Sequence, residues 1–200
     1  GLDQKGADRV RVILEQEGLE IFTGERAVKL LGEDRVEGLE TDMRRLTCDT
    51  LVWALGMRPR VDLAKDAGID IGSTGGIRVD EHLQTNIPGV FACGDCIETD
   101  DLITGEACLN LFWHNAKRQG SLVGTNCMGS EGRYAGSQNI LNVNLFGHQI
   151  VGFGHTARVL KRGRGMGRDG PEVSIREGER DGGYYRLVIR DDRCVGAQFI

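Results

Sequence analysis

The sequence lacks several features that would assign it to other classes of protein. It has no run of roughly 18 apolar residues, so it predicts no membrane-spanning helix. Its first residues, GLDQKGADRVR, contain no apolar stretch of the kind that a signal peptide needs. Its net charge of −5 lacks the basic excess that phosphate binding requires, which excludes nucleic acid as the main partner. Proline is scarce, at 3 residues against 30 glycines, and this balance indicates tight turns and close backbone approaches rather than disorder.

The cysteines have no framework spacing, since they stand at positions 48, 93, 96, 108, 127 and 194. Reduced thiols in a cytoplasmic protein are the simplest interpretation. Cys93 and Cys96 form a C-x-x-C, which is typical of a thiol redox pair or half a metal site. No second C-x-x-C or H-x-x-x-H supplies further ligands, so we predict no metal. Asp95, between the two thiols, is expected to raise their pKa, which weighs against catalytic thiols.

Hydrophobic periodicity predicts an α/β chain with a different final third. A helical pattern covers residues 7–14, TLVWAL at 50–55 suits a buried strand, and helical spacing returns over 105–123. Two hairpin-like segments at 26–31 and 35–40 precede the apolar run. Beyond a polar stretch at 129–136 the periodicity becomes that of strands. The alternating segments ILNVNLFG, QIVGFG, EVSI, YYRLVIR and CVGAQFI predict a small antiparallel sheet.

The stretch PGVFACGD, residues 88–95, carries the clearest chemical signal. It reads as a buried strand that ends at Gly94 and presents Asp95 at its C-terminal edge, where ligands bind in open α/β sheets. Gly94 lets a ligand approach the backbone, and the carboxylate of Asp95 accepts hydrogen bonds from a polyol. We expect a helix to follow and to point its N-terminus at the same ligand.

Four segments together resemble one family. Thr85-x-x-Pro88-x-Val90-Phe91-Ala92-x-Gly94-Asp95 resembles the second flavin motif of the FAD-dependent pyridine nucleotide-disulfide oxidoreductase superfamily. TLVWALGMRP resembles its crossover between nucleotide domains, and TGGIRVDEHLQT resembles the lead-in to the flavin motif. Trp113-x-Asn115-Ala116-x-x-Gln119-Gly120 resembles the flavin-side helix of its NADH oxidase, nitrite reductase and rubredoxin reductase-like branch. The final residues, 184–200, resemble its C-terminal interface domain.

The resemblance implies roles for particular residues. Asp95 binds the ribityl hydroxyls of FAD, Gly94 lies beneath them, and the crossover is formed by Gly56 and Pro59. The flavin ring lies near three helix residues, namely Trp113, Asn115 and Ala116. Arg60 departs from the pattern, in which relatives usually carry Asn. The implied fold is α/β, with partial FAD/NAD(P)-binding Rossmann-like domains before a small α+β domain with an antiparallel sheet. The implied domains are the rear of an NAD(P)-binding domain at 1–54, an FAD-binding segment at 55–128 and an interface domain at 129–200.

The resemblance also implies an activity. Hydride passes from NAD(P)H to FAD, and electrons pass on to oxygen, a small redox protein or another small acceptor. No histidine reproduces the His-Pro pair of the large disulfide reductases, which favours the oxidase or electron-transfer branch. The implied assembly is a homodimer through the C-terminal domain.

The glycine fingerprints of the family are the features that the chain does not show. The single G-x-G-x-x-G, at 165–170, lacks a strand before it and a helix after it, so a mobile basic loop is the preferred interpretation. We therefore expect a C-terminal portion of a longer flavoenzyme, inactive without its N-terminal FAD/NAD(P) half. Two alternatives remain open: a non-catalytic interaction or oligomerisation module, and a C-x-x-C thiol-redox protein. The basic residues of 158–168 are a surface for an acidic partner or, preferably, a solvated loop.

Overall fold

The computed structural model describes residues 2–160 and 172–200. The chain divides into two compact units, one formed by Leu14–Met57 and the other by residues 1–13 together with 58–200. The division into three domains at positions 54 and 128 stays a prediction.

The smaller unit contains a three-stranded antiparallel meander. Its strands are β1 (Ala27–Leu31), β2 (Gly38–Thr41) and β3 (Arg45–Thr47). The hairpin-like pattern over 26–40 is thereby confirmed. Gly32 makes the first turn at φ +113°, and a Cβ there would lie 1.9 Å from the carbonyl oxygen of Arg35. Only glycine fits, so this turn is fixed by a single residue.

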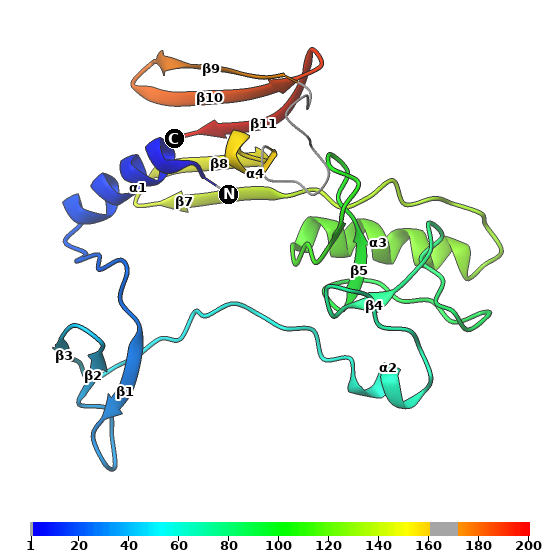
Figure 1. Cartoon of the computed structure of the whole chain (residues 1–200), viewed down its shortest axis with the longest axis horizontal. Coiled ribbons are helices and arrows are strands. Elements are labelled where there is room, and N and C mark those ends of the chain that lie inside the picture. Colours follow the sequence, from blue (N-terminus) through cyan, green and yellow to red (C-terminus); the bar gives the residue numbers. More distant parts are fainter. Residues whose placement is uncertain (1, 161–171) are drawn as a thin grey trace. The chain divides into compact units, whose positions relative to one another are not determined.

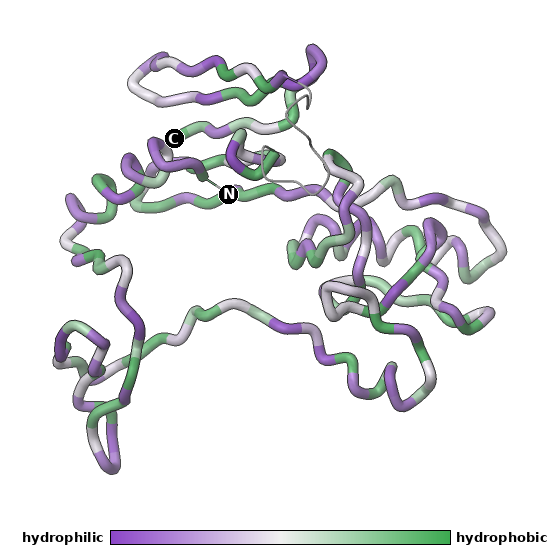
Figure 2. Tube along the Cα trace, in the orientation of Figure 1, coloured by the Kyte–Doolittle hydropathy of each residue, from purple (hydrophilic) through white to green (hydrophobic). Residues whose placement is uncertain are grey.

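The apolar run at 50–55 forms no strand, and the sequence prediction is wrong at this point. Val52 and Leu55 are each 82% exposed, and Trp53 is 54% exposed. A strand is held by backbone hydrogen bonds to its neighbours, and no strand in the described part of the chain pairs with this run. The run is the largely hydrophobic stretch that follows β3 in Figure 2. Hydrophobicity alone therefore does not make a strand here.

The first half of the larger unit is a mixed α/β arrangement (Figure 1). Its elements are α1 (Gln4–Gln16, of which residues up to 13 belong here), α2 (Asp62–Asp66), β4 (Ile77–Arg78), β5 (Ile97–Asp100), β6 (Ala107–Cys108) and α3 (Trp113–Asn126). Strand β5 lies in the middle of the sheet, parallel to β4 and antiparallel to β6. The core beneath it is formed by Val61, Ala64, Ile77, Leu83 and Ile97.

Two details near the Gly-Asp motif differ from the sequence prediction. The expected strand over residues 89–92 is reduced to a single bridge between Gln84 and Phe91. The segment that follows Asp95 is the strand β5, not a helix. Helix α3 begins only at Trp113, and residues 107–108, where the sequence has helical spacing, pair with β5 as β6. The motif is therefore a turn between a bridge and a strand.

Helix α3 buries polar side chains completely, whereas its apolar Leu122 and Val123 are only partly buried against the core. Its fully buried residues are Asn115, Gln119 and Asn126, whose spacing of four and seven places them on one side of the helix. Asn126 donates to the carbonyl oxygens of His82 (2.9 Å) and Gly132 (3.0 Å). These hydrogen bonds satisfy backbone groups that have no partner in a β-sheet, and they offset the cost of burying the amide.

The second half of the larger unit is a five-stranded antiparallel sheet, as the alternating pattern predicts. Its order is β7-β8-β11-β10-β9, and its strands are β7 (Ile140–Leu145), β8 (His148–Gly154), β9 (Val173–Arg180), β10 (Gly183–Arg190) and β11 (Arg193–Phe199). A short helix, α4 (Ala157–Leu160), follows β8 and contributes Leu160 to the core of this half. That core consists of Leu160, Val188 and Val195, and Ile103 packs against it. The fold is α/β with antiparallel sheets.

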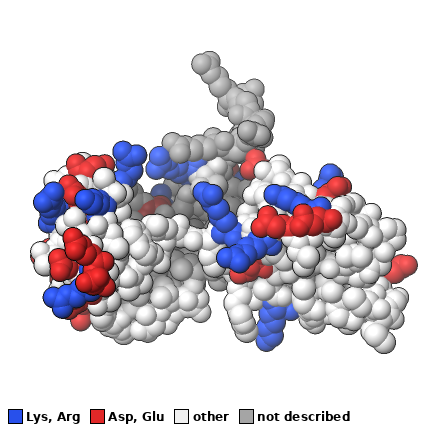
Figure 3. Space-filling model, turned by 90° about the horizontal axis from the view of Figure 1, so that it is seen from below, with Lys and Arg blue, Asp and Glu red and all other residues white. Residues whose placement is uncertain are grey.

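Residues 3–9, at the start of α1, contact this sheet through charged groups. Arg186 Nε lies 2.8 Å from Asp3 Oδ2, and Lys5 and Arg9 pair with Glu177 and Glu179 on β9. Acidic and basic side chains are interspersed on the face that Figure 3 shows. Among the described residues, no helix is both long and apolar enough to cross a membrane.

Candidate functional site

The Gly-Asp motif is delivered by a tightly hydrogen-bonded loop. Thr85 N donates to Val90 O (2.8 Å), and the Thr85 hydroxyl donates to the same oxygen (3.0 Å). Ala92 N donates to the carbonyl oxygen of Leu83 (3.0 Å), whose side chain is only 1% exposed in the core. The core thus anchors the backbone immediately before the motif.

Gly94 turns the chain with φ +87°, in the left-handed region that other residues avoid. A Cβ built at this position would meet no atom within 4 Å. The glycine is therefore required by the backbone conformation and not by crowding from the protein. The open space beside it is available to a ligand.

Asp95 presents unpaired groups next to that space. Its side chain is exposed, and within the described part of the chain neither its carboxylate nor its backbone N–H has a hydrogen-bond partner. A polyol hydroxyl both donates and accepts, so one residue offers complementary groups of both kinds. The turn is suited to hold a sugar-like chain.

Helix α3 supports the turn from behind. Gly94 N donates to Gln119 Oε1 at 2.8 Å, and Gln119 is 2% exposed. Gln119 Nε2 donates to Tyr134 Oη (3.1 Å) and lies 3.4 Å from Ser137 Oγ. The sequence motif contains Gln119, but the pattern alone gave it no role. The sequence signal for its burial is its spacing from Asn115 and Asn126, which places the three amides on one face of the helix.

The other helix residues of the motif have different surroundings. Trp113 is 75% exposed, and Lys117 Nζ lies 5.1 Å from the centroid of its ring. Asn115 is 1% exposed and bonds Gln138 twice, accepting from its N–H (3.0 Å) and donating to its carbonyl oxygen (2.9 Å). Its amide is therefore committed to the protein. Ala116 is half-buried on the same helix. Proximity of these residues to a flavin ring stays a prediction.

The predicted crossover residues flank the boundary between the two compact units, which falls between Met57 and Arg58. Gly56 is exposed at φ +90°, and Pro59 is half-buried. Their role in a crossover stays a prediction.

The two thiols of the motif are free, and the environment of Cys96 disfavours its thiolate. Cys96 Sγ donates weakly to the carbonyl oxygen of Cys93 (3.4 Å). Burial raises the pKa of the Cys96 thiol, and the neighbouring Cys93 and Asp95 raise it further. This direction opposes thiolate chemistry. No group of three or more His, Cys, Asp or Glu suited to a metal ion occurs among the described residues.

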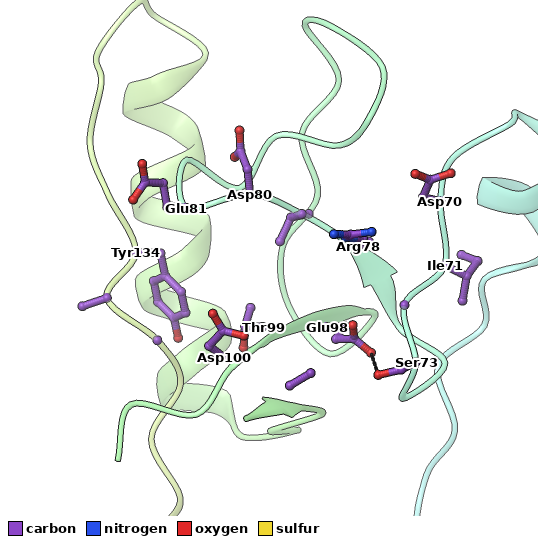
Figure 4. A pocket seen from close by; sticks show the side chains of 15 residues that line it. Asp70, Ile71, Ser73, Arg78, Asp80, Glu81, Glu98, Thr99, Asp100 and Tyr134 are labelled. Atoms are coloured by element: carbon purple, nitrogen blue, oxygen red, sulfur yellow. Dashed lines mark hydrogen bonds between the residues drawn. The ribbon is translucent and has the colours of Figure 1, made fainter. Parts of the chain in front are cut away.

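A separate hollow of about 640 Å³ lies beside β4 and β5 (Figure 4). Its lining is acidic, with a single basic residue, Arg78, among the residues Asp70, Asp80, Glu81, Glu98 and Asp100. Glu98 already accepts hydrogen bonds from Thr74 and Ser73. The excess of carboxylates would repel the phosphates of a nucleotide. We therefore place the candidate site at the Gly94–Asp95 turn, which does not line this hollow.

Two features of the sequence cannot be placed. The G-x-G-x-x-G at 165–170 lies outside the described residues. The same is true of the basic cluster except for Arg158, in α4.

Comparisons with known proteins agree on one family. The family model described as "Pyridine nucleotide-disulphide oxidoreductase" matches residues 1–120. An NADH oxidase of Methanocaldococcus jannaschii is 37% identical over 156 residues, covering 78% of this chain and 35% of that protein. The structure of a FAD-dependent pyridine nucleotide-disulphide oxidoreductase from Desulfovibrio vulgaris is similar with a TM-score of 0.87 and 30% identity, covering 98% of this chain and 49% of the other.

A NAD-dependent persulfide reductase from A. fulgidus is also similar, with a TM-score of 0.88 and 26% identity over 99% of this chain and 38% of that one. The chain thus spans half or less of the length of these relatives.

Proposed function

This chain belongs to the pyridine nucleotide-disulphide oxidoreductase family, and on that premise we propose that it is part of an FAD-dependent NAD(P)H oxidoreductase. When bound, FAD supplies the chemistry that accepts hydride from NAD(P)H and passes electrons on. The residues of this chain bind and orient it. The acceptor is oxygen, a small redox protein or another small molecule.

The observation that carries this proposal is the turn at Gly94 and Asp95. Gly94 leaves open space beside its backbone, and Asp95 offers an unpaired N–H and carboxylate to that space. The ribityl chain of FAD is a polyol whose hydroxyls match these groups. A hydrogen bond to a charged group contributes about 1.5–3 kcal/mol. The fit of the turn to the group therefore supports Asp95 as the ribityl-binding residue.

The same premise extends to the assembly. We propose that the functional protein includes an N-terminal half with further FAD- and NAD(P)-binding residues, because the relatives are about twice as long or longer. We further propose a homodimer through the C-terminal sheet and a cytoplasmic location. The six free cysteines accord with a reducing compartment.

The decisive experiment replaces Asp95 by Ala in the full-length protein and measures bound FAD per chain. Loss of the carboxylate should weaken FAD binding by roughly tenfold to a hundredfold. Asp66→Ala is the matched control, because Asp66 is also an exposed aspartate but belongs to α2 and not to the turn. Unchanged FAD content in Asp95→Ala would overturn the ribityl role.

A second measurement tests the need for the other half. The 200-residue chain, purified alone, should neither retain FAD nor oxidise NAD(P)H. A stoichiometrically yellow preparation, seen in the flavin absorbance bands, would contradict this expectation.

A further inference from the structure

The backbone N–H of Gly94 is already bonded within the protein. It donates to Gln119 Oε1 at 2.8 Å, and Gln119 is 2% exposed within the polar face of α3. Gly94 therefore has no donor left for a ligand. Its neighbour Asp95 keeps both its N–H and its carboxylate unpaired in the described part of the chain. One N–H is thus paired with a buried side chain, and the next is left unpaired.

The orientation of the Gln119 amide is itself fixed. Its Nε2 donates to Tyr134 Oη (3.1 Å), and Tyr134 Oη lies 3.1 Å from Ser137 Oγ. Ser137 is 1% exposed and also shares a 2.7 Å hydrogen bond with Thr99 on β5. Because these hydroxyl oxygens take the amide hydrogens, Oε1 faces Gly94. If the Gln119 amide were flipped, its NH₂ group would face the Gly94 N–H, and two donors would oppose each other.

We propose that Gln119 is a positioning residue that holds the turn in its FAD-binding conformation. This inference rests on the proposed function. The left-handed conformation of Gly94 is one of several that glycine adopts readily, so an external contact must select it. Gln119 supplies that contact, and the selected conformation faces the Asp95 groups outward. Without the contact the turn samples other conformations, and the free energy of ordering it weakens FAD binding.

Three variants of the full-length apoprotein separate this role from general stability. Gln119→Met keeps the length and removes the amide. Gln119→Glu keeps an acceptor for Gly94 N–H, while the rotatable hydroxyls of Tyr134 and Ser137 turn to donate to its other oxygen. Tyr134→Phe removes one acceptor of the Gln119 amide hydrogens, while Ser137 Oγ at 3.4 Å remains to keep Oε1 towards Gly94. FAD affinity is measured by quenching of flavin fluorescence, alongside the midpoint of thermal unfolding.

Gln119→Met should bind FAD at least about tenfold more weakly, and Gln119→Glu should recover most of that loss. Tyr134→Phe should lose less than about threefold at a comparable fall in thermal midpoint. If affinity instead follows thermal midpoint across all three variants, Gln119 is only structural and the proposal fails. If the FAD affinity is unchanged in Asp95→Ala as well, the proposed function also fails. If the FAD affinity falls in Asp95→Ala but not in Gln119→Met, only this inference is overturned.

Hydrogen exchange on the wild-type apoprotein decides the matter should Gln119→Met not fold. Gly94 N–H should be protected before FAD is added, whereas Asp95 N–H should exchange rapidly and become protected only with FAD. Rapid exchange at Gly94 in the apoprotein would overturn the proposal.

Discussion

Replacing Gly94 by Ala is the sharpest test of the turn, because the structure separates its two costs. A Cβ at Gly94 would touch no protein atom within 4 Å, so packing adds nothing to the cost of the substitution. The backbone angle of φ +87° lies in the left-handed region, where an L-residue costs about 1–2 kcal/mol. We therefore expect the apoprotein to lose about 1–2 kcal/mol of unfolding free energy.

The effect on FAD should exceed that cost, because the new methyl group occupies the space proposed for the ribityl chain. Gly68→Ala is the matched control: Gly68 has φ +75°, also with nothing within 4 Å, and follows α2. Both variants are prepared in the full-length protein, and urea unfolding and FAD titration are run side by side. Similar stability losses are expected, with at least about tenfold weaker FAD binding in Gly94→Ala only. Equal FAD affinity in the two variants would refute the reasoning.

Two further predictions concern Asp101 and the thiols. Burial alone would raise the pKa of Asp101. Hydrogen bonds from the N–H groups of Thr104 and Ile103, together with the nearby His155 imidazole, instead hold this pKa below its ordinary value. Its stabilisation is therefore complete above the ordinary carboxyl pKa and is lost as pH falls through the lower folded value. Asp101→Asn should cost about 1–3 kcal/mol at neutral pH and flatten this acid-side dependence in urea unfolding; an unchanged pH profile would contradict the assignment. Replacing Cys93 and Cys96 together by Ser should leave FAD content and NAD(P)H turnover within about twofold, because burial raises the pKa of Cys96. Collapse of turnover with FAD still bound would show that the thiols are catalytic.

The sequence patterns succeeded where the chain supplies its own partners. The strands of the C-terminal sheet were predicted because each alternating segment pairs with another segment of the same sheet. The apolar patterns at residues 50–55 and 89–92 predicted strands wrongly. Among the described residues the first segment pairs with no strand, and the second makes only the single bridge between Gln84 and Phe91. Periodicity reports which side chains suit burial, whereas pairing depends on backbone groups elsewhere in the fold.

The chain by itself determined the family and the antiparallel final third, and it singled out Gly94 and Asp95 as the candidate site. These follow from local chemistry, because a left-handed turn requires glycine and a polyol requires an acceptor. Only the tertiary structure decided that the N–H of Gly94 is turned inward to Gln119, 25 positions away, and that Asp95 keeps its N–H unpaired. A hydrogen bond between distant residues depends on how α3 packs behind the turn. No spacing along the chain encodes that distance.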